Sequence, residues 1–292
     1  MWFFASNTIA NLEERKIASG FGFLGREAGF EIGESAFLRY GAADTYARAL
    51  VVGLTNTLAV ALIGIVLATG LGTTIGLSRL SRNFLLRNFA AAYVEFMRNV
   101  PLLVQLFFWY AVITEGMPGP REALSPLPGV FISNRGIFFP TFSSAPELQG
   151  FNFTGGAVLT PEFAALLIGL TTYTAAFIAE IVRAGVLAVD RGQTEAAHAL
   201  GLSRPQTTRL VVLPQALRVI VPPMTSQYLN LTKNSSLAVA IGYPDLVSIA
   251  NTTMNQTGQA IEGIATIMAV YLTISLSISA FMNWYNAHVA MR

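Results

Sequence analysis

The chain contains a run of 29 consecutive residues, from position 49 to position 77, without a single charged side chain. An α-helix of that length measures about 40 Å, which exceeds the roughly 30 Å hydrocarbon core of a bilayer. Soluble proteins rarely bury so long an apolar helix on every side. Composition agrees, because only 12% of the residues are charged, about half the share of an average soluble domain. The sequence therefore predicts an integral membrane protein.

Five regions are apolar and long enough to cross a bilayer as helices. The fourth of them is interrupted by three prolines and by Lys233, whereas the others are more continuous. Strands of a membrane barrel would instead alternate over segments of about ten residues. We therefore expect an all-α fold, a polytopic membrane bundle with five core transmembrane helices, in residues 49–77, 84–114, 162–186, 219–250 and 262–289.

Arginines are concentrated in two of the links between these regions. Three follow the first region, and five lie between the third and the fourth when those at the edges are counted. The 115–161 link has only Arg121 and Arg135. Basic residues favour the cytoplasmic side, so the two basic links and the C-terminus are predicted to be cytoplasmic. Residues 115–161 then form an external loop, and residues 1–45 an external N-terminal segment.

The predicted external segment at the start has to be carried across the membrane. A preceding helix would do this, and residues 1–5 resemble the last turn of one. We therefore expect a further helix upstream, and the alternative is a short tail that translocates by itself. No signal peptide is visible, because no basic start is followed by a sufficiently long apolar run.

The predicted external loop, residues 115–161, is rich in proline, glycine and phenylalanine. Loops of this length without obvious structure are usually functional or mobile. Two interpretations stay open: a short amphipathic cap that faces an external partner, or an ordinary surface loop.

The link of residues 187–214, hereafter the knuckle, contains signals for two short helices. Thr194 is a candidate N-cap of the first helix, and Gly201 a candidate C-terminal stop because glycine tolerates the left-handed conformation. Ser203 and Gln206 have the spacing of a capping box that restarts the chain, with a proline in the first turn. Pro214 is expected to close the unit. The sequence thus predicts a stiff helix–turn–helix that presents a small alanine and leucine surface.

The knuckle carries a motif that resembles the signature of permease subunits of ATP-binding-cassette importers. That signature is Glu-Ala-Ala, a glycine, and then an aliphatic residue, one further residue and Leu-Pro, at fixed spacing. Residues 98–105, 179–185, 213–218 and 233–237 resemble the polar-amino-acid branch of this family, and the long start and outer loop resemble its larger, broad-specificity members. The signature stands here as Glu195, Ala196, Ala197, Gly201, Val211, Leu213 and Pro214, with Val211 where isoleucine is commoner.

The resemblance implies a methionine-importer-like permease fold over residues 46–292, in the bacterial inner membrane. It also implies that the knuckle is a cytoplasmic coupling loop that contacts a separate ATPase, which binds ATP and magnesium, while this chain binds no cofactor and is not an enzyme. The implied partners are two ATPase subunits, a second permease subunit or another copy, and an external amino-acid-binding protein. The chain would form half of the pathway for polar, acidic or general L-amino acids.

Polar residues inside the predicted spans are candidates for the substrate path, because charges at membrane depth are costly and usually functional. The alternative is that they pair with one another, or extend to the headgroups, and only hold the bundle together. The candidates are Tyr173, Glu180, Lys233, Asn234, Ser235 and Ser236.

Three residues of the second span are candidates for gating or for a structural role. Glu95 and Arg98 have helical spacing and are expected to form a local ion pair, with gating as the alternative. Pro101 is expected to kink the helix, because it lacks a backbone N–H and its ring clashes with the preceding turn.

Other function classes find little support in the sequence. There is no cysteine, and His198 and His288 are too isolated for a metal site. A phosphate-binding loop is absent; the nearest run, residues 72–76, lacks the lysine and is better interpreted as a small-residue face for helix packing. A net charge of +2 is too small and scattered for binding nucleic acid. A stand-alone secondary transporter or channel is the alternative, and which amino acid moves is left open.

Overall fold

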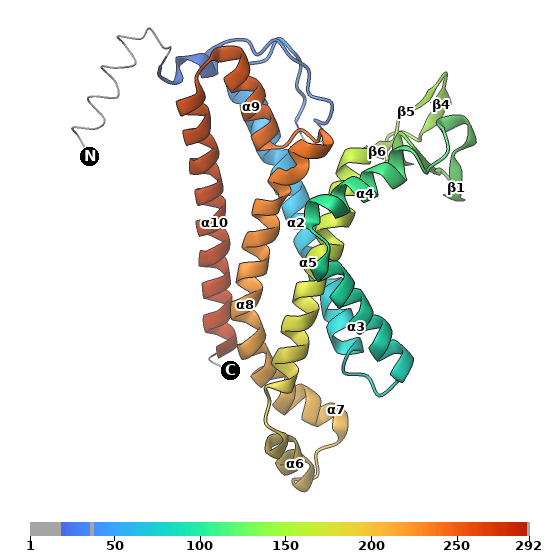
Figure 1. Ribbon diagram of the computed structural model, residues 1–292, viewed down its shortest axis with the longest axis vertical. Coiled ribbons are helices and arrows are strands. Elements are labelled where there is room, and N and C mark those ends of the chain that lie inside the picture. Colours follow the sequence, from blue (N-terminus) through green and yellow to red (C-terminus); the bar gives the residue numbers. More distant parts are fainter. Residues whose placement is uncertain (1–18, 36–37, 291–292) are drawn as a thin grey trace, which may run out of the picture. The chain divides into compact units, whose positions relative to one another are not determined.

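The computed structural model describes residues 19–35 and 38–290 (Figure 1). Residues 1–5, where the sequence suggested a helix end, lie outside this range. The chain divides into two compact units. The first comprises Met1–Val60 and Ser235–Ile274, and the second comprises Ala61–Asn234 and Ser275–Arg292.

Helices account for most of the described residues. They are α2 (Tyr46–Ser78), α3 (Phe84–Asn99), α4 (Leu102–Thr114), α5 (Pro161–Leu187), α6 (Arg191–Ala199), α7 (Arg204–Thr207), α8 (Leu213–Asn234), α9 (Leu246–Thr257) and α10 (Ala260–Ala290). Short 3-10 turns cover Phe21–Gly25, Pro120–Glu122 and Ser235–Ile241, and one π-helical turn covers Thr208–Val212.

Three of the described helices, α2, α5 and α10, are long and apolar enough to cross a membrane. A fourth span results if the bent pair of α3 and α4 is counted as one. Helices α2, α5 and α10 match the first, third and fifth predicted spans, and the bent pair of α3 and α4 matches the second. The prediction of one span over residues 219–250 was wrong, because α8 ends at Asn234 and a 3-10 turn and α9 follow. Gly242, at a φ of +80°, lies in the break before α9.

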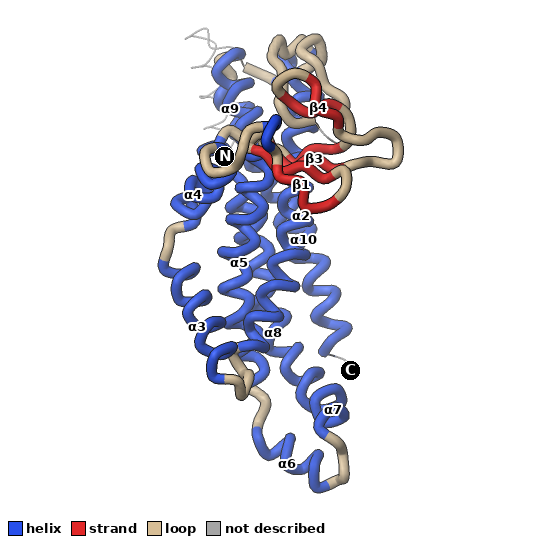
Figure 2. The backbone as a smooth tube through the Cα atoms, turned by 90° about the vertical axis from the view of Figure 1, so that its right-hand side faces the viewer, coloured by secondary structure: helices blue, strands red, loops and turns tan. Residues whose placement is uncertain are grey.

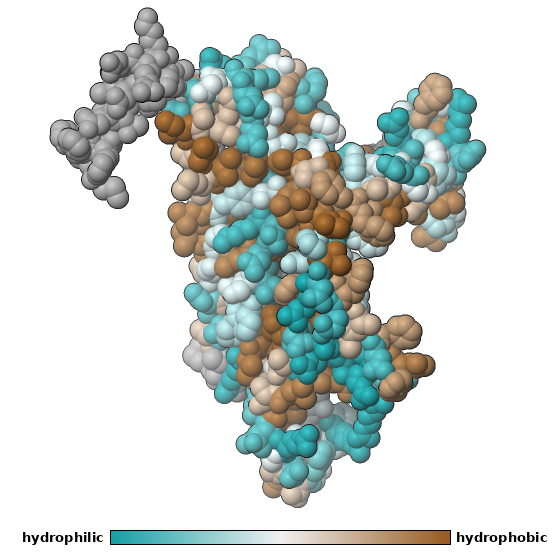
Figure 3. All heavy atoms as spheres, viewed as in Figure 1, coloured by the Kyte–Doolittle hydropathy of each residue, from teal (hydrophilic) through white to brown (hydrophobic). Residues whose placement is uncertain are grey.

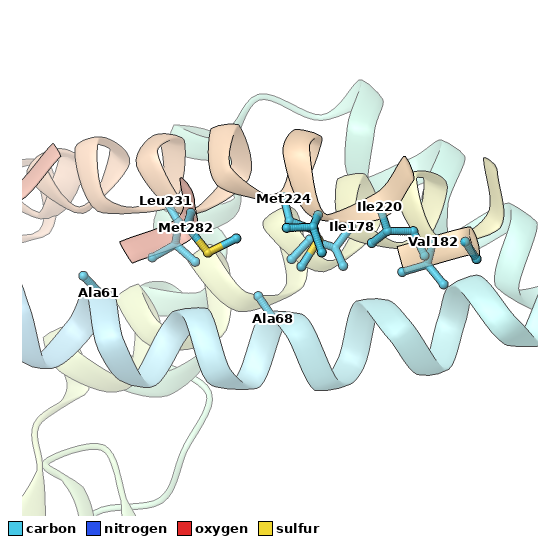
Figure 4. Close-up of a cluster of buried hydrophobic side chains, with 10 residues drawn as sticks. Ala61, Ala68, Ile178, Val182, Ile220, Met224, Leu231 and Met282 are labelled. Atoms are coloured by element: carbon cyan, nitrogen blue, oxygen red, sulfur yellow. The ribbon is translucent and has the colours of Figure 1, made fainter. Parts of the chain in front are cut away.

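The core of the second unit forms where α2, α5 and α8 meet, with one residue from α10 (Figure 4). In both backbone views α8 runs alongside α5, and the two helices are in contact (Figures 1 and 2). Ile178 and Leu231 are fully buried, and Met224 fills the space between the helices. The buried members are Ala61, Ala68, Ile178, Val182, Ala216, Ile220, Val221, Met224, Leu231 and Met282.

Close contact between α2 and α5 depends on two glycines. A Cβ at Gly72 would lie 2.7 Å from the Cβ of Ile178, and one at Gly76 would lie 2.6 Å from the Ala179 carbonyl oxygen. Small residues allow helices to approach this closely in membranes. The packing role predicted for residues 72–76 is confirmed.

The first unit packs part of the N-terminal segment against α2, α9 and α10. Its buried cluster includes Phe23, Tyr46 and Leu246. Asn56 of α2 is 1% exposed, and its side-chain amide donates to the carbonyl oxygens of Glu34 and Pro244, at 2.9 Å each. Thr57 accepts a hydrogen bond from the Leu246 N–H at 3.1 Å. Polar side chains of α2 therefore hold the N-terminal segment at Glu34 and the chain around the start of α9 in place within this unit.

The loop between α4 and α5 contains six short strands, hereafter the strand loop (residues 115–160). No strand was predicted there. A four-stranded antiparallel sheet has the order β1-β2-β3-β6, and β4 pairs with β5. Phe153 packs on the rings of Phe131 and Phe138, with centroids 4.6 and 4.9 Å away. The strands are β1 (Leu124–Leu127), β2 (Val130–Ser133), β3 (Gly136–Phe139), β4 (Glu147–Gln149), β5 (Asn152–Thr154) and β6 (Ala157–Leu159).

The close approach of α2 to α5 can be tested with two matched glycine substitutions. Gly72→Ala should lower the free energy of unfolding by about 1–3 kcal/mol, the usual cost of an overpacked core. Gly70→Ala is the control, because nothing lies within 4 Å of the position that its new Cβ would take, and both changes carry the same gain in helix propensity. Thermal unfolding of the purified protein in nanodiscs measures both. Equal melting temperatures for the two variants would contradict the packing.

Candidate functional site

The first helix of the knuckle, α6, begins at Arg191, and its N-cap is Asp190. The Asp190 carboxylate accepts the Gly192 N–H at 2.6 Å. The prediction that Thr194 is the cap was wrong, because Thr194 lies inside the helix. An acidic cap satisfies the first free N–H groups and suits the positive end of the helix dipole, so the helix starts one turn earlier than predicted.

The end of α6 has the geometry that the sequence predicted. Gly201 adopts a φ of +82°, in the left-handed region. The Gly201 N–H donates to the His198 carbonyl at 2.9 Å, and the Leu202 N–H donates to the Ala197 carbonyl at 3.1 Å. This pair of bonds is the Schellman motif, which closes a helix and turns the chain sharply.

The second helix of the knuckle starts as predicted but does not stop at Pro214. The Gln206 side chain accepts the Ser203 N–H at 2.9 Å, as in a capping box. After α7 the chain passes through the π-helical turn directly into α8, which begins at Leu213. Pro214 therefore lies in the first turn of the long helix α8, where its missing N–H falls at the change from π- to α-helical bonding. The prediction that Pro214 closes the unit was wrong.

The knuckle exposes most of the residues of the signature. Glu195, Ala196 and Gly201 are exposed, whereas Ala197 is 4% exposed and packs inward. Leu200 is 83% exposed at the turn after α6, and Leu210 is 61% exposed in the π-helical turn, so the knuckle carries uncovered apolar side chains. Both ribbon views show the knuckle extending beyond the ends of α5 and α8 (Figures 1 and 2). In the space-filling view its surface is largely hydrophilic with apolar patches (Figure 3).

Helices α3 and α4 meet at 105°, with the break at Val100 and Pro101. Pro101 cannot donate to the Met97 carbonyl, and the side chain of Gln105 donates to it instead, at 3.0 Å. A second bond from Gln105 reaches the Val100 carbonyl at 3.0 Å. The predicted kink is confirmed as a full break. Gln105 was missed as a structural residue, although a glutamine four positions after a proline in an apolar run is a usable signal.

Glu180 forms ion pairs with two arginines within the second unit. Its carboxylate contacts Arg79, just after α2, and Arg183, one turn further along α5. Two alternatives for Glu180 followed from the sequence, the substrate path and a tie that holds the bundle together. This geometry supports the structural role, because the ion pair between Arg79 and Glu180 joins the end of α2 to α5.

The predicted ion pair between Glu95 and Arg98 is wrong: no ion pair between described residues joins them. The Arg98 guanidinium instead lies 5.2 Å from the centre of the Phe177 ring, a cation–π distance. Phe177 in turn packs on the ring of Tyr173, at 5.0 Å between ring centres. Arg98 of α3 is thus held against α5 by an aromatic pair rather than by a carboxylate.

The remaining path candidates lie around the end of α8. Lys233 is exposed in the last turn of α8, beside Asn234. Ser235 is fully buried and Ser236 half-buried at the start of the 3-10 turn, which belongs to the first unit. Tyr173 lies in the other unit, so the six candidates are not assembled into one site within either unit. The described residues contain no group of three or more potential metal ligands.

Curated relatives match nearly the whole chain, and two of them illustrate the similarity. The putative amino-acid ABC transporter permease protein YhdX of Escherichia coli is 47% identical, covering 99% of this chain and 90% of its own length. The general L-amino acid transport system permease protein AapQ of Rhizobium johnstonii is 43% identical, covering 100% and 88%.

Two solved structures share the fold. A crystal structure of an amino acid ABC transporter with histidines matches with a TM-score of 0.63 at 26% identity, covering 83% of this chain and 95% of that one. The MetNI methionine ABC transporter in an inward-facing conformation matches with a TM-score of 0.59 at 19% identity, covering 83% and 97%. The expected methionine-importer-like fold is confirmed.

A family model described as the inner membrane component of binding-protein-dependent transport systems matches residues 61–292. This match and the relatives confirm a multi-pass inner-membrane subunit that is not itself an ATPase; ATP is bound by a separate subunit of the complex. A transporter that works alone is thereby excluded. The chain belongs to the family of permease subunits of amino-acid ATP-binding-cassette importers, in the branch that contains YhdX and AapQ.

Proposed function

We propose that this chain forms half of a transmembrane pathway for polar, acidic or general L-amino acids, and that a separate ATPase drives it through the knuckle. The observation that carries the proposal is the exposed tip of the knuckle, with Glu195, Leu200 and Gly201 at its surface. The name of AapQ, which refers to general L-amino acid transport, supports the substrate class.

The connection between the knuckle and α8 provides a mechanical basis for coupling. Since α7, the π-helical turn and α8 form one continuous helical stretch, a force applied to the knuckle is transmitted directly to α8. The α6 arm is rigidly closed by its Schellman turn at Gly201. Closure of two ATPases would then move permease halves as rigid bodies between inward- and outward-open states.

The proposed arrangement of the complex follows the family and the charge distribution. Residues 46–292 form the permease domain, preceded by an external segment of residues 1–45. The strand loop faces outside, where an amino-acid-binding protein delivers cargo, and the knuckle faces two cytoplasmic ATPases. A second, similar permease or another copy completes the pathway. Helix α8 supplies the fourth span along the chain, which brings the core spans to five.

For the pathway itself, we assign Glu180 to bundle stability and keep Tyr173, Lys233, Asn234, Ser235 and Ser236 as lining residues. The assignment of Glu180 rests on its two arginine partners. Arg98 and Pro101 keep a structural role, and Glu95, which has exposed surface at the same helix end, is the remaining candidate for gating.

Leu200→Ser tests the contact with the ATPase. Leu200 is 83% exposed, so its replacement should leave the melting temperature of the permease within about 1 °C, since changes at such surface positions alter stability little. Loss of a buried apolar contact in the complex should weaken ATPase association about ten-fold or more. Co-purification and ATP hydrolysis measure this. Phe142→Ser, at an exposed position of the strand loop, is the control, and wild-type coupling in Leu200→Ser would contradict the proposal.

Single cysteines test the proposed sidedness against a clean background, because the chain has no cysteine. Phe142→Cys should react with a membrane-impermeant maleimide added to intact cells, whereas Ala199→Cys should react only after the inner membrane is opened. Both positions are exposed. Labelling is measured by a mass shift on gels. The reverse pattern would place the knuckle outside and overturn the coupling proposal.

A double-mutant cycle tests the role of Glu180. Glu180→Gln should lower the melting temperature, because it leaves Arg79 and Arg183 without their shared carboxylate. Adding Arg79→Gln should cost less than the sum of the two single changes, with a coupling energy of about 0.5–3 kcal/mol. Amino-acid uptake in vesicles is measured in parallel. Lost uptake at unchanged melting temperature would return Glu180 to the substrate path.

A further inference from the structure

A pocket of about 410 Å³ lies in the second unit, where the strand loop meets the end of α4 and the beginning of α5. Its lining includes Tyr110, Asn134, Arg135 and Glu162. The volume falls in the range of about 300–1,000 Å³ that is typical of small-molecule sites. None of these residues belongs to the knuckle or to the candidates for the membrane path.

Hydrogen-bonded turns and helix ends position the pocket residues. Asn134 and Arg135 are the two residues of the tight turn between β2 and β3, and the Asn134 N–H donates to the Pro118 carbonyl at 2.9 Å. Glu162 lies in the first turn of α5, where a negative side chain is well placed at the positive end of the helix. Rigid elements hold binding groups more accurately than free loops do.

The pocket presents one positive and one negative side chain that do not neutralise each other. Among the described residues no ion pair includes Arg135 or Glu162. The Glu162 carboxylate accepts a hydrogen bond from the Tyr110 hydroxyl at 3.1 Å, which fixes its position at the pocket. No other residue of the described lining is charged.

An acceptor in the pocket also lacks a donor. The side-chain oxygen of Asn134 is buried and has no hydrogen-bond partner in the structure. Buried polar atoms are nearly always hydrogen-bonded in native proteins, so this oxygen marks a polar group of the pocket wall that the fold leaves unpaired. Because that oxygen is shielded from solvent, the Glu162 carboxylate is the acceptor that the pocket offers to a cationic ligand group.

We propose that this pocket binds the backbone of a free α-amino acid. The ligand carboxylate pairs with the guanidinium of Arg135, and its ammonium donates to the Glu162 carboxylate. Because the lining offers no further charge, the site recognises the groups on the α-carbon and tolerates many side chains. The inference rests on the proposed function, in which amino acids are the transported substrates. It adds a site in the strand loop where a transported amino acid binds.

The test uses the assembled transporter in nanodiscs without its binding protein. Binding of radiolabelled L-glutamine is measured for the wild type and for Arg135→Gln and Glu162→Gln. Each change should weaken binding about ten-fold or more, because each removes a charge-assisted hydrogen bond. Arg121→Gln is the matched control; this arginine lies in the same loop but stacks on the Phe151 ring outside the pocket, and its replacement should leave binding unchanged.

Ligand analogues and a second variant make the outcome decisive. L-Alanine should compete with the label, whereas N-acetyl-L-alanine and L-alaninamide, which lack the ammonium or the carboxylate, should not. Arg135 is exposed, so a lost affinity in Arg135→Gln at unchanged melting temperature supports the site. Leu200→Ser should bind like the wild type, which separates this site from failure of ATPase coupling.

Three results would overturn the proposal. The first is equal affinity of the wild type and both pocket variants, and the second is equal competition by alanine and its two derivatives. The third comes from a separate measurement in which the binding protein is added to the same nanodiscs. If the pocket variants weaken its association while glutamine binding stays unchanged, the pocket is a docking site for that protein.

Discussion

The absence of water inside a bilayer is the constraint on which this structure depends. Every backbone N–H and C=O within the membrane needs a partner from the protein, because an unpaired group costs several kcal/mol there. Long helices meet this demand by themselves, and α2, α5 and α10 do so over 27 or more residues each. Wherever the chain departs from a regular helix, a particular side chain has to supply the missing bond.

The break at Pro101, inside the bent pair of α3 and α4, is one such departure, and the buried start of α9 follows the same rule. Gln105 supplies the donor that Pro101 lacks, so a sharp bend forms without leaving the Met97 carbonyl unpaired. At α9 the buried carboxylate of Asp245 accepts the Ser248 N–H at 2.8 Å, and Thr57 of α2 accepts the next free N–H, that of Leu246. Polar residues in the spans therefore have structural roles that compete with any role in transport.

Whether a feature of the structure could be predicted from the sequence depends on how far away in the sequence the interacting residues lie. Features set by a few consecutive residues were predictable: the spans of α2, α5 and α10, the left-handed Gly201 and the bond from Ser203 to Gln206. Features set by partners distant in the sequence were not. Nothing near Glu180 in the sequence reveals Arg79, and nothing near Arg98 reveals the ring of Phe177.

Two local features were also missed, for physical reasons that can be stated. Asp190 and Thr194 both qualify as helix caps, and the earlier one prevails because its carboxylate reaches Gly192 at the positive helix end. The strands of the strand loop are only three or four residues long, too short for an alternating pattern to stand out. The aromatic contacts of Phe153 that stabilise them come from residues 15 and 22 positions away.

The long helix α5 connects the two regions to which we assign function. It begins at Pro161, beside the pocket of the strand loop, and ends at Leu187, three residues before Asp190, the N-cap of α6. Between them it packs against α3, α4 and α8 and is tied to Arg79 through Glu180. A helix transmits displacement along its axis with little compression, so the proposed ligand binding at one end and the proposed ATPase contact at the other would act on the same rigid body. Coupling between them then requires only that α5 has two positions relative to its neighbours, each favoured by one partner.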